Sequence, residues 1–140
     1  MRLYLFDEGI DNVFSQPNSP SGRSDIVGEL DSDEPLLMEV KVIDSEKGYR
    51  VNRIYEGFSQ IVAYTDNFIK NFGFLVIFNM DNKQINFSHS ESNGRFPASI
   101  HFNNRTIYFV VINCNNEIPA SKRGKMDEIT IPLNELTKGQ

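Results

Sequence analysis

The chain has 140 residues, of which 39% are hydrophobic, so it is long enough for one domain with a single core. Its formal net charge of -5 argues against a strong, sequence-independent grip on nucleic acid, and its single cysteine excludes an internal disulfide framework. The sequence has neither an apolar run of about 18 residues nor a signal-peptide pattern, so we expect a cytoplasmic protein without a membrane span.

The N-terminal quarter predicts short strands joined by polar loops. Residues 2–6 (RLYLF) and 24–30 (SDIVGEL) are typical of strands, whereas residues 11–22 have loop composition with two prolines. Residues 31–35 (DSDEP) predict an acidic turn. Because another apolar strand follows at once, we expect an antiparallel hairpin with a five-residue connection.

The strand predicted at residues 36–44 (LLMEVKVID) is the one around which the chain is organised. Its side chains alternate between two faces, with Met38, Val40 and Val42 on one and Leu37, Glu39, Lys41 and Ile43 on the other. A carboxylate and an ammonium thus lie side by side between hydrophobic neighbours. Charges in such a place are costly unless they are paired or bind something. Two interpretations stay open: a Glu–Lys pair on the wet face of a surface strand, or part of a functional site.

A helix is predicted over residues 51–71, because apolar residues recur there at helical spacing: Ile54, Phe58, Ile61, Thr65, Phe68 and Phe72. We expect Gly73 to cap its C-terminus. The continuous apolar run at residues 74–78 (FLVIF) predicts a strand covered on both faces. Strand, helix and strand of these lengths predict a βαβ crossover between parallel strands.

The remaining sequence favours β-structure. Strands are predicted at residues 84–89, 106–114 and 129–133, and Pro132 makes the last of these an edge strand. Residues 115–127 read as an exposed basic loop that is a solvated connection. Cys114 ends an apolar run and is expected to be a small buried residue. His89 and His101 have no ligand spacing, and we assign them no role.

Asp25 lies 14 residues before Glu39, on the partner strand of the proposed hairpin. The turn between them brings the two carboxylates close to opposite each other. Two carboxylates with a backbone carbonyl form an oxygen-rich site for a hard cation such as Mg²⁺. Lys41 would lie beside that ion on the same face. A metal ion next to a lysine is suited to hydrolysing a phosphodiester, because it activates water and neutralises phosphate charge.

These residues resemble the motif of the PD-(D/E)XK nuclease superfamily, which has the restriction-endonuclease-like fold. The resemblance is carried by Ser24-Asp25 in SGRSDIV and by Glu39-Val40-Lys41 in LLMEVKV. Members similar to the RecB-type nucleases also carry a Gln and, four residues on, a Tyr in the next helix. Here that helix has the segment SQIVAYTDNF, with Gln60 and Tyr64. The resemblance covers roughly residues 21–80.

The resemblance implies an α/β fold with a mixed β-sheet, one long crossover helix and additional C-terminal strands in a single domain, 1–140, that can be part of a larger protein. It implies that Asp25, Glu39 and the carbonyl of Val40 bind Mg²⁺ or Mn²⁺, and that Lys41 and Gln60 complete the catalytic set. The implied activity is metal-dependent hydrolysis of DNA. The alternative is an inactive nuclease-fold module that binds a protein or nucleic acid in a larger assembly.

Several features depart from the family pattern or stay open. The chain has Ser24 where the motif name has proline, and residues 1–20 offer no helix before the Asp25 strand. The acidic total is unusual for a free-standing nuclease, so a partner domain or a homodimer can supply further DNA-binding surface. Tyr64 is expected one helical turn beyond Gln60. Arg23 either touches a phosphate or pairs with an acid in its loop.

Overall fold

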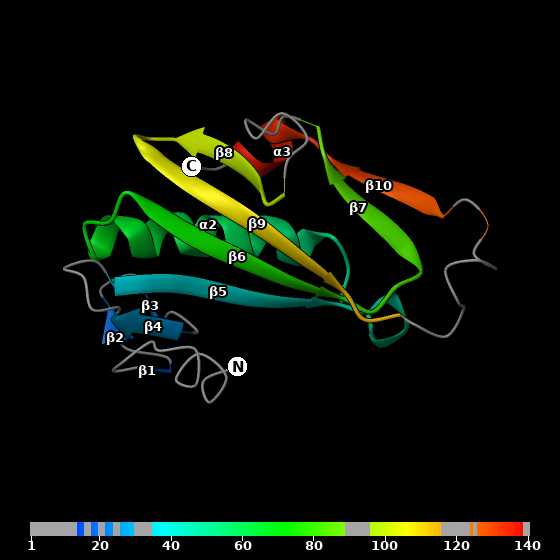
Figure 1. Ribbon diagram of the computed structural model, residues 1–140, viewed down its shortest axis with the longest axis horizontal. Helices are drawn as coiled ribbons and strands as arrows, with labels where there is room; N and C mark the ends of the chain where they lie inside the picture. The colour runs from blue at the N-terminus through cyan, green and yellow to red at the C-terminus, as the bar shows by residue number, and fades with distance from the viewer. Residues whose placement is uncertain are drawn as a thin grey trace.

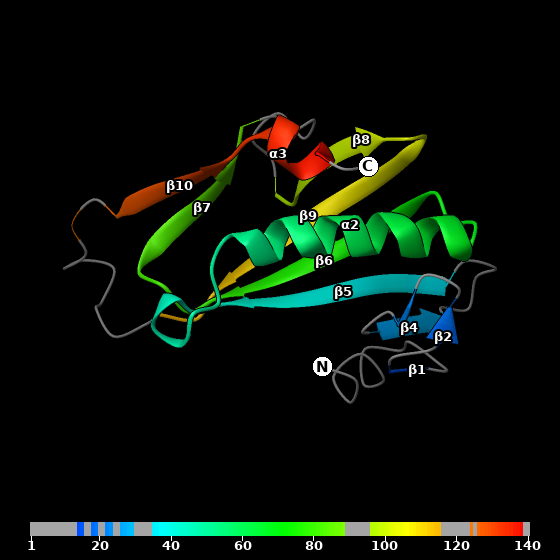
Figure 2. The same cartoon turned by 180° about the vertical axis from the view of Figure 1, so that it is seen from behind.

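The computed structural model describes residues 14–15, 18–19, 22–23, 26–29, 35–88, 96–115, 124 and 126–138. Within these residues the main sheet has six strands, and α2 (Asn52–Asn67) lies along one of its faces (Figures 1 and 2). The sheet runs in the spatial order β1 (Phe14–Ser15), β4 (Ile26–Glu29), β5 (Pro35–Ile43), β6 (Phe72–Asn79), β9 (Arg105–Asn113) and β8 (Ala98–Phe102). The predicted α/β class is therefore confirmed.

Smaller elements flank this sheet. A parallel pair joins β7 (Lys83–Phe87) to β10 (Asp127–Ile131), and an antiparallel pair joins β2 (Asn18–Ser19) to β3 (Gly22–Arg23). A 3-10 turn, η1 (Ser45–Lys47), follows β5, and a short helix, α3 (Leu133–Thr137), follows β10. No described helix is both long and apolar enough to cross a membrane.

The predicted hairpin is present as β4 and β5, which pair antiparallel with Ile26 opposite Met38. The strand predicted at residues 2–6 lies outside the described residues. The loop predicted at residues 11–22 is wrong in part, because β1, β2 and the start of β3 fall within it. Strands of two residues are too short to leave an alternating pattern in the sequence, so composition alone could not reveal them.

The two faces of β5 are those that the alternation predicts. Leu37 and Ile43 are buried in the main core beneath α2, whereas Met38 and Val40 pack in a smaller cluster on the opposite face. The predicted crossover is also confirmed, since β5 and β6 run parallel and are joined through α2. β9 continues the parallel order beyond β6. Three parallel strands therefore form the centre of the sheet.

The helix is shorter than its sequence predicts. It ends at Asn67, and Ile69 adopts a left-handed φ of 54° that turns the chain toward β6. Gly73 is not its cap, because this residue lies within β6. A Cβ on Gly73 would lie 2.8 Å from Cγ1 of Ile61, so the missing side chain lets the helix approach the strand closely. The glycine serves packing between elements rather than helix termination.

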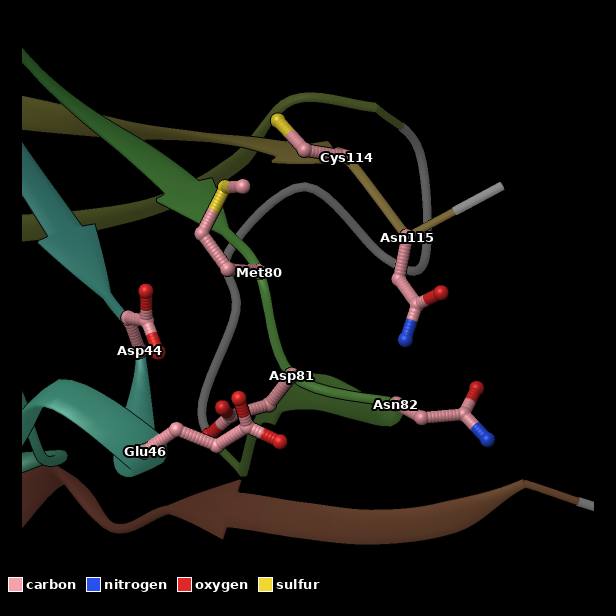
Figure 3. Close-up of a pocket in the computed structure, with 7 residues that line it drawn as sticks. All are labelled: Asp44, Glu46, Met80, Asp81, Asn82, Cys114 and Asn115. Carbon is pink, nitrogen blue, oxygen red and sulfur yellow. The ribbon is translucent and has the colours of Figure 1, made fainter. Parts of the chain in front are cut away.

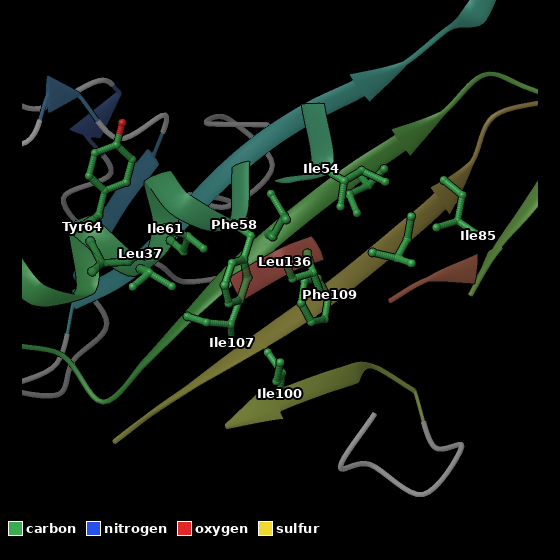
Figure 4. Close-up of a cluster of buried hydrophobic side chains, with 14 of the residues drawn as sticks. Leu37, Ile54, Phe58, Ile61, Tyr64, Ile85, Ile100, Ile107, Phe109 and Leu136 are labelled. Atoms are coloured by element: carbon green, nitrogen blue, oxygen red, sulfur yellow. The ribbon is translucent and has the colours of Figure 1, made fainter. Parts of the chain in front are cut away.

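The main core lies between α2 and the sheet (Figure 4). Phe58 on α2 packs edge-on against Phe102 of β8 and stacks on Phe109 of β9, with ring centroids 5.8 and 6.1 Å apart. Phe87 of β7 stacks on the same Phe109 at 4.2 Å. Leu136 of α3 is buried in this cluster too. Aromatic contacts thus join the helix, the main sheet and the β7–β10 pair.

The C-terminal predictions hold for two strands and partly for a third. β7 and β9 correspond to the strands predicted at 84–89 and 106–114, and β10 ends at Ile131, after which Pro132 precedes α3. β8 was not predicted. His101 on this strand is exposed and lies 3.5 Å from the hydroxyl of Thr106. His89 and most of the predicted basic loop lie outside the described residues.

Candidate functional site

Strand β5 places Glu39 and Lys41 side by side on the face that α2 covers. The Lys41 ammonium lies 2.7 Å from Oε1 of Glu39, and the two side chains are only 12% and 2% exposed. The interpretation as a pair on the wet face of a surface strand is therefore wrong. The alternation could show that the two charges share a face, but only the position of α2 shows that this face is buried.

The surroundings explain why a charged pair can exist under the helix. Leu37 and Ile43, on the same face of β5, are almost fully buried and exclude water on either side. Gly57 of α2 lies over the pair, since a Cβ built there would be 2.9 Å from Cγ of Lys41. The alkyl stem of Lys41 thus runs beneath the helix while its ammonium reaches Glu39. Opposite charges at hydrogen-bond distance offset part of the desolvation cost of each.

The two helix residues of the predicted motif differ in environment. Gln60 is exposed, whereas Tyr64 is 2% exposed and belongs to the core. Residues of an α-helix turn by about 100° each, so Gln60 lies about 200° around the axis from Phe58. Because Phe58 faces β8 and β9, Gln60 lies on the side of α2 away from those strands. The structure thus places Gln60 in solvent and Tyr64 in the interior.

The structure describes the three other predicted site residues to different extents. Asp25 lies outside the described residues. Arg23 belongs to β3, but its side chain is outside the described part of the structure. The side chain of Val40 packs on the opposite face of β5 from Glu39, which is the orientation that the alternation predicts. Of the predicted set, the structure therefore brings together Glu39 and Lys41.

A separate cavity of about 350 Å³ lies where the parallel strands β5, β6 and β9 end (Figure 3). Its lining includes Asp44, which follows β5, and Asp81, which follows β6. This cavity was not predicted from the sequence. Its sequence signal is the polar residues that follow consecutive strands, because ligands of open α/β sheets bind at the carboxyl ends of strands. Cys114 also lines the cavity and is half-buried, so its predicted burial is wrong because it lies beyond the end of β9.

Two of the three acids that line this cavity, Asp81 and Asp44, have partners in the fold. Asp81 accepts hydrogen bonds from the backbone N–H and the hydroxyl of Ser45, at 2.8 and 2.5 Å. Asp44 caps η1 and pairs with Lys47 at 3.2 Å. Among the described residues, no three His, Cys, Asp or Glu side chains are grouped so that they could hold a metal ion. Asp44 and Asp81 thus stabilise the turn that contains η1.

One titratable group of α2 is perturbed away from the candidate site. Burial raises the pKa of Tyr55 above its ordinary value, and the negative charge of Glu135 on α3 raises it further. Both effects disfavour the phenolate. They mark the packing of α2 against α3 and have no connection to Glu39.

The chain matches no protein-family model, no curated protein and no solved structure. A function must therefore be argued from the residues of the site and their chemistry. The Glu39–Lys41 pair is the candidate functional site, because two opposite charges lie together, shielded from solvent, on a central strand of the sheet.

Proposed function

We propose that this protein is a metal-dependent nuclease that hydrolyses phosphodiester bonds of DNA, with a restriction-endonuclease-like fold. The observation that carries the proposal is the shielded pair of Glu39 and Lys41 on β5. Water-excluded charges suit a catalytic site, because their field is not damped by solvent. The spacing of the two residues is that of the motif which the sequence resembles.

The order of the strands supports the same proposal. An antiparallel strand (β4), the strand with Glu39 and Lys41 (β5), a crossover helix (α2) and a parallel strand (β6) follow one another along the chain. The described register ends with Ile26 opposite Met38. The proposal requires that this register continue by one residue, which would set Asp25 opposite Glu39. Directly opposed residues of a sheet share a face.

The donor chemistry fits a divalent cation in part. Glu39 offers carboxylate oxygens, which Mg²⁺ and Mn²⁺ prefer, and the proposed further ligands are Asp25 and the carbonyl of Val40. Within the described residues Glu39 is the one carboxylate of this set, so binding depends on Asp25. When bound, a cation of this kind lowers the pKa of a water molecule and neutralises phosphate charge.

The protein residues have separate proposed tasks. Lys41 supplies a positive charge and hydrogen-bond donors that stabilise charge developing on the phosphate or orient the attacking water. Gln60, exposed on α2, is free of the core and can hydrogen-bond a phosphate oxygen or the water. Arg23 would contact a neighbouring phosphate. Tyr64 supports α2 from within the core rather than touching the substrate.

One observation favours an alternative function. The ammonium of Lys41 lies 2.7 Å from Oε1 of Glu39 and both side chains are shielded from solvent, as in a purely structural ion pair. In that case the protein is an inactive nuclease-fold module that binds a protein or nucleic acid in an assembly. The two functions differ in one simple property, because only a nuclease site needs to bind divalent metal.

The experiment combines metal binding with cleavage. The melting temperature of the purified chain is measured with EDTA, Mg²⁺ or Mn²⁺, and cleavage of fluorescent single- and double-stranded DNA is followed under the same conditions. A ligand at 100 times its dissociation constant stabilises the folded state by about 2.7 kcal/mol. We expect Glu39→Gln to abolish both the metal-dependent stabilisation and cleavage, and Lys41→Gln to lower cleavage roughly a hundred- to thousandfold.

Matched substitutions control for charge and for contamination. Glu56→Gln changes an exposed acid of α2, and Lys83→Gln changes an exposed lysine of β7. Neither should alter cleavage or metal binding. Equal cleavage by the wild type and Lys41→Gln would show that the activity belongs to an impurity. Absence of any metal-dependent stabilisation would leave the binding-module function in place of the nuclease.

A further inference from the structure

Gly57 occupies an unfavourable position for a glycine. It lies in the interior of α2, where glycine destabilises a helix by about 1 kcal/mol relative to alanine. It is also buried on the stripe that faces the sheet, between the core residues Ile54 and Ile61. A glycine at such a position indicates that another element approaches the helix backbone closely.

The approaching groups are side chains of β5 and β6. A Cβ on Gly57 would lie 2.7 Å from Cδ1 of Leu75, 2.9 Å from Cγ of Lys41 and 3.2 Å from Cε of Lys41. The first two distances are too short for real contacts, so a methyl group at this position would have to displace both side chains. Leu75 is fully buried, which leaves the Lys41 stem as the group with room to move.

We propose that Gly57 is a positioning residue for Lys41. The missing side chain leaves a channel between α2 and β5 in which the alkyl stem of Lys41 lies, and this path brings its ammonium to Oε1 of Glu39. A side chain at position 57 would shift the stem and move the ammonium away from that oxygen. The inference rests on the proposed function for its catalytic meaning, but the position of the ammonium can be measured without any activity.

A second glycine provides the matched control. A Cβ on Gly73 of β6 would lie 2.8 Å from Cγ1 and 3.0 Å from Cδ1 of Ile61, and 3.0 Å from Cγ2 of Thr65. The crowding is therefore similar in degree, and it involves the same helix and sheet. None of these contacts includes Lys41. Gly73→Ala thus reports what crowding between α2 and the sheet does by itself.

The experiment observes the side-chain ammonium of Lys41 by NMR in protein labelled with ¹⁵N at lysine Nζ, in the presence of EDTA. A buried, ion-paired ammonium exchanges its protons slowly enough to be seen, and the Lys41→Met spectrum identifies its signal by subtraction. We expect the wild type and the control variant Gly73→Ala to show the Lys41 ammonium signal at the same chemical shift. In Gly57→Ala it should move or disappear through faster exchange.

A double variant separates positioning from packing. Gly57→Ala combined with Leu75→Val relieves the contact with Leu75 but leaves that with Lys41, so the signal should stay displaced while stability recovers. An unchanged Lys41 signal in Gly57→Ala, or no Lys41 signal in the wild type, would overturn the proposal. So would a double variant that restores the signal, because Gly57 would then serve packing alone.

Cleavage assays test the catalytic consequence of the Lys41 position independently of the NMR measurement. If the wild type is a nuclease, Gly57→Ala should lower kcat roughly a hundredfold, as expected for a misplacement of about 1 Å, while the metal dissociation constant stays the same. Gly73→Ala should retain kcat. If the wild type does not cleave DNA, the proposed function fails while the NMR result still decides whether Gly57 positions Lys41.

Discussion

Replacing Lys41 by methionine should destabilise the protein far more than replacing an exposed lysine. Methionine retains most of the alkyl stem, so the change removes the charge with little loss of packing. The carboxylate of Glu39 then stays 2% exposed without the ammonium that lies 2.7 Å away in the wild type. Breaking a buried pair by removing one partner costs about 3–5 kcal/mol.

This free energy corresponds to a large shift in melting temperature. Unfolding entropy is about 2.1 cal/mol/K per residue, which gives roughly 0.3 kcal/mol/K for a chain of this length. A loss of 3–5 kcal/mol therefore lowers the melting temperature by roughly 10–17 °C. Circular dichroism during heating and urea titration, both in EDTA, measure the loss independently.

A double substitution tests the electrostatic explanation. Glu39→Leu combined with Lys41→Met removes both charges, and such replacements are often neutral or stabilising, so the double variant should be more stable than Lys41→Met. Lys83→Met, at an exposed position of β7, should change stability by less than about 0.5 kcal/mol. The reasoning is refuted if Lys41→Met is no less stable than Lys83→Met.

Three further predictions concern the scaffold. The pKa of Tyr55 is raised in the folded state, so its neutral phenol stabilises the fold fully below about pH 10, and this stabilisation is lost as the pH rises through the folded-state pKa. The free energy of unfolding of Tyr55→Phe should therefore fall less steeply with rising pH in this range than that of the wild type, as measured by alkaline denaturation. Ile69→Gly should raise the free energy of unfolding by about 1 kcal/mol, because the β-branched Ile69 adopts a left-handed φ of 54° that glycine adopts without strain. A urea titration that shows destabilisation would contradict this. Asn79 is fully buried and donates to the carbonyl of Lys83 and to Oδ1 of Asn113, at 2.7 and 2.9 Å, so Asn79→Leu should cost about 1–3 kcal/mol by the same titration.

The sequence by itself determined the features that depend on local periodicity. The alternation along residues 36–44 set the two faces of β5 and placed Glu39 with Lys41, and the turn composition predicted the antiparallel pairing of β4 with β5. The helical spacing of Ile54, Phe58 and Ile61 located α2. The continuous apolar run after it predicted a parallel strand, although Phe74 and Phe78 on the face away from α2 are only half-buried. Each of these features arises within one element or between neighbours in the sequence.

Only the tertiary structure decided what covers the site. The sequence left open whether the Glu39–Lys41 pair was wet or buried, because that depends on how closely α2 approaches β5. It also misassigned Gly73 to a helix cap, since a glycine required for close packing and one required for a left-handed turn look the same in a sequence. The roles of Gly57 and Gly73 come from contacts between residues distant in sequence. Such contacts are set by the packing of whole elements, which leaves no periodic signal in any one of them.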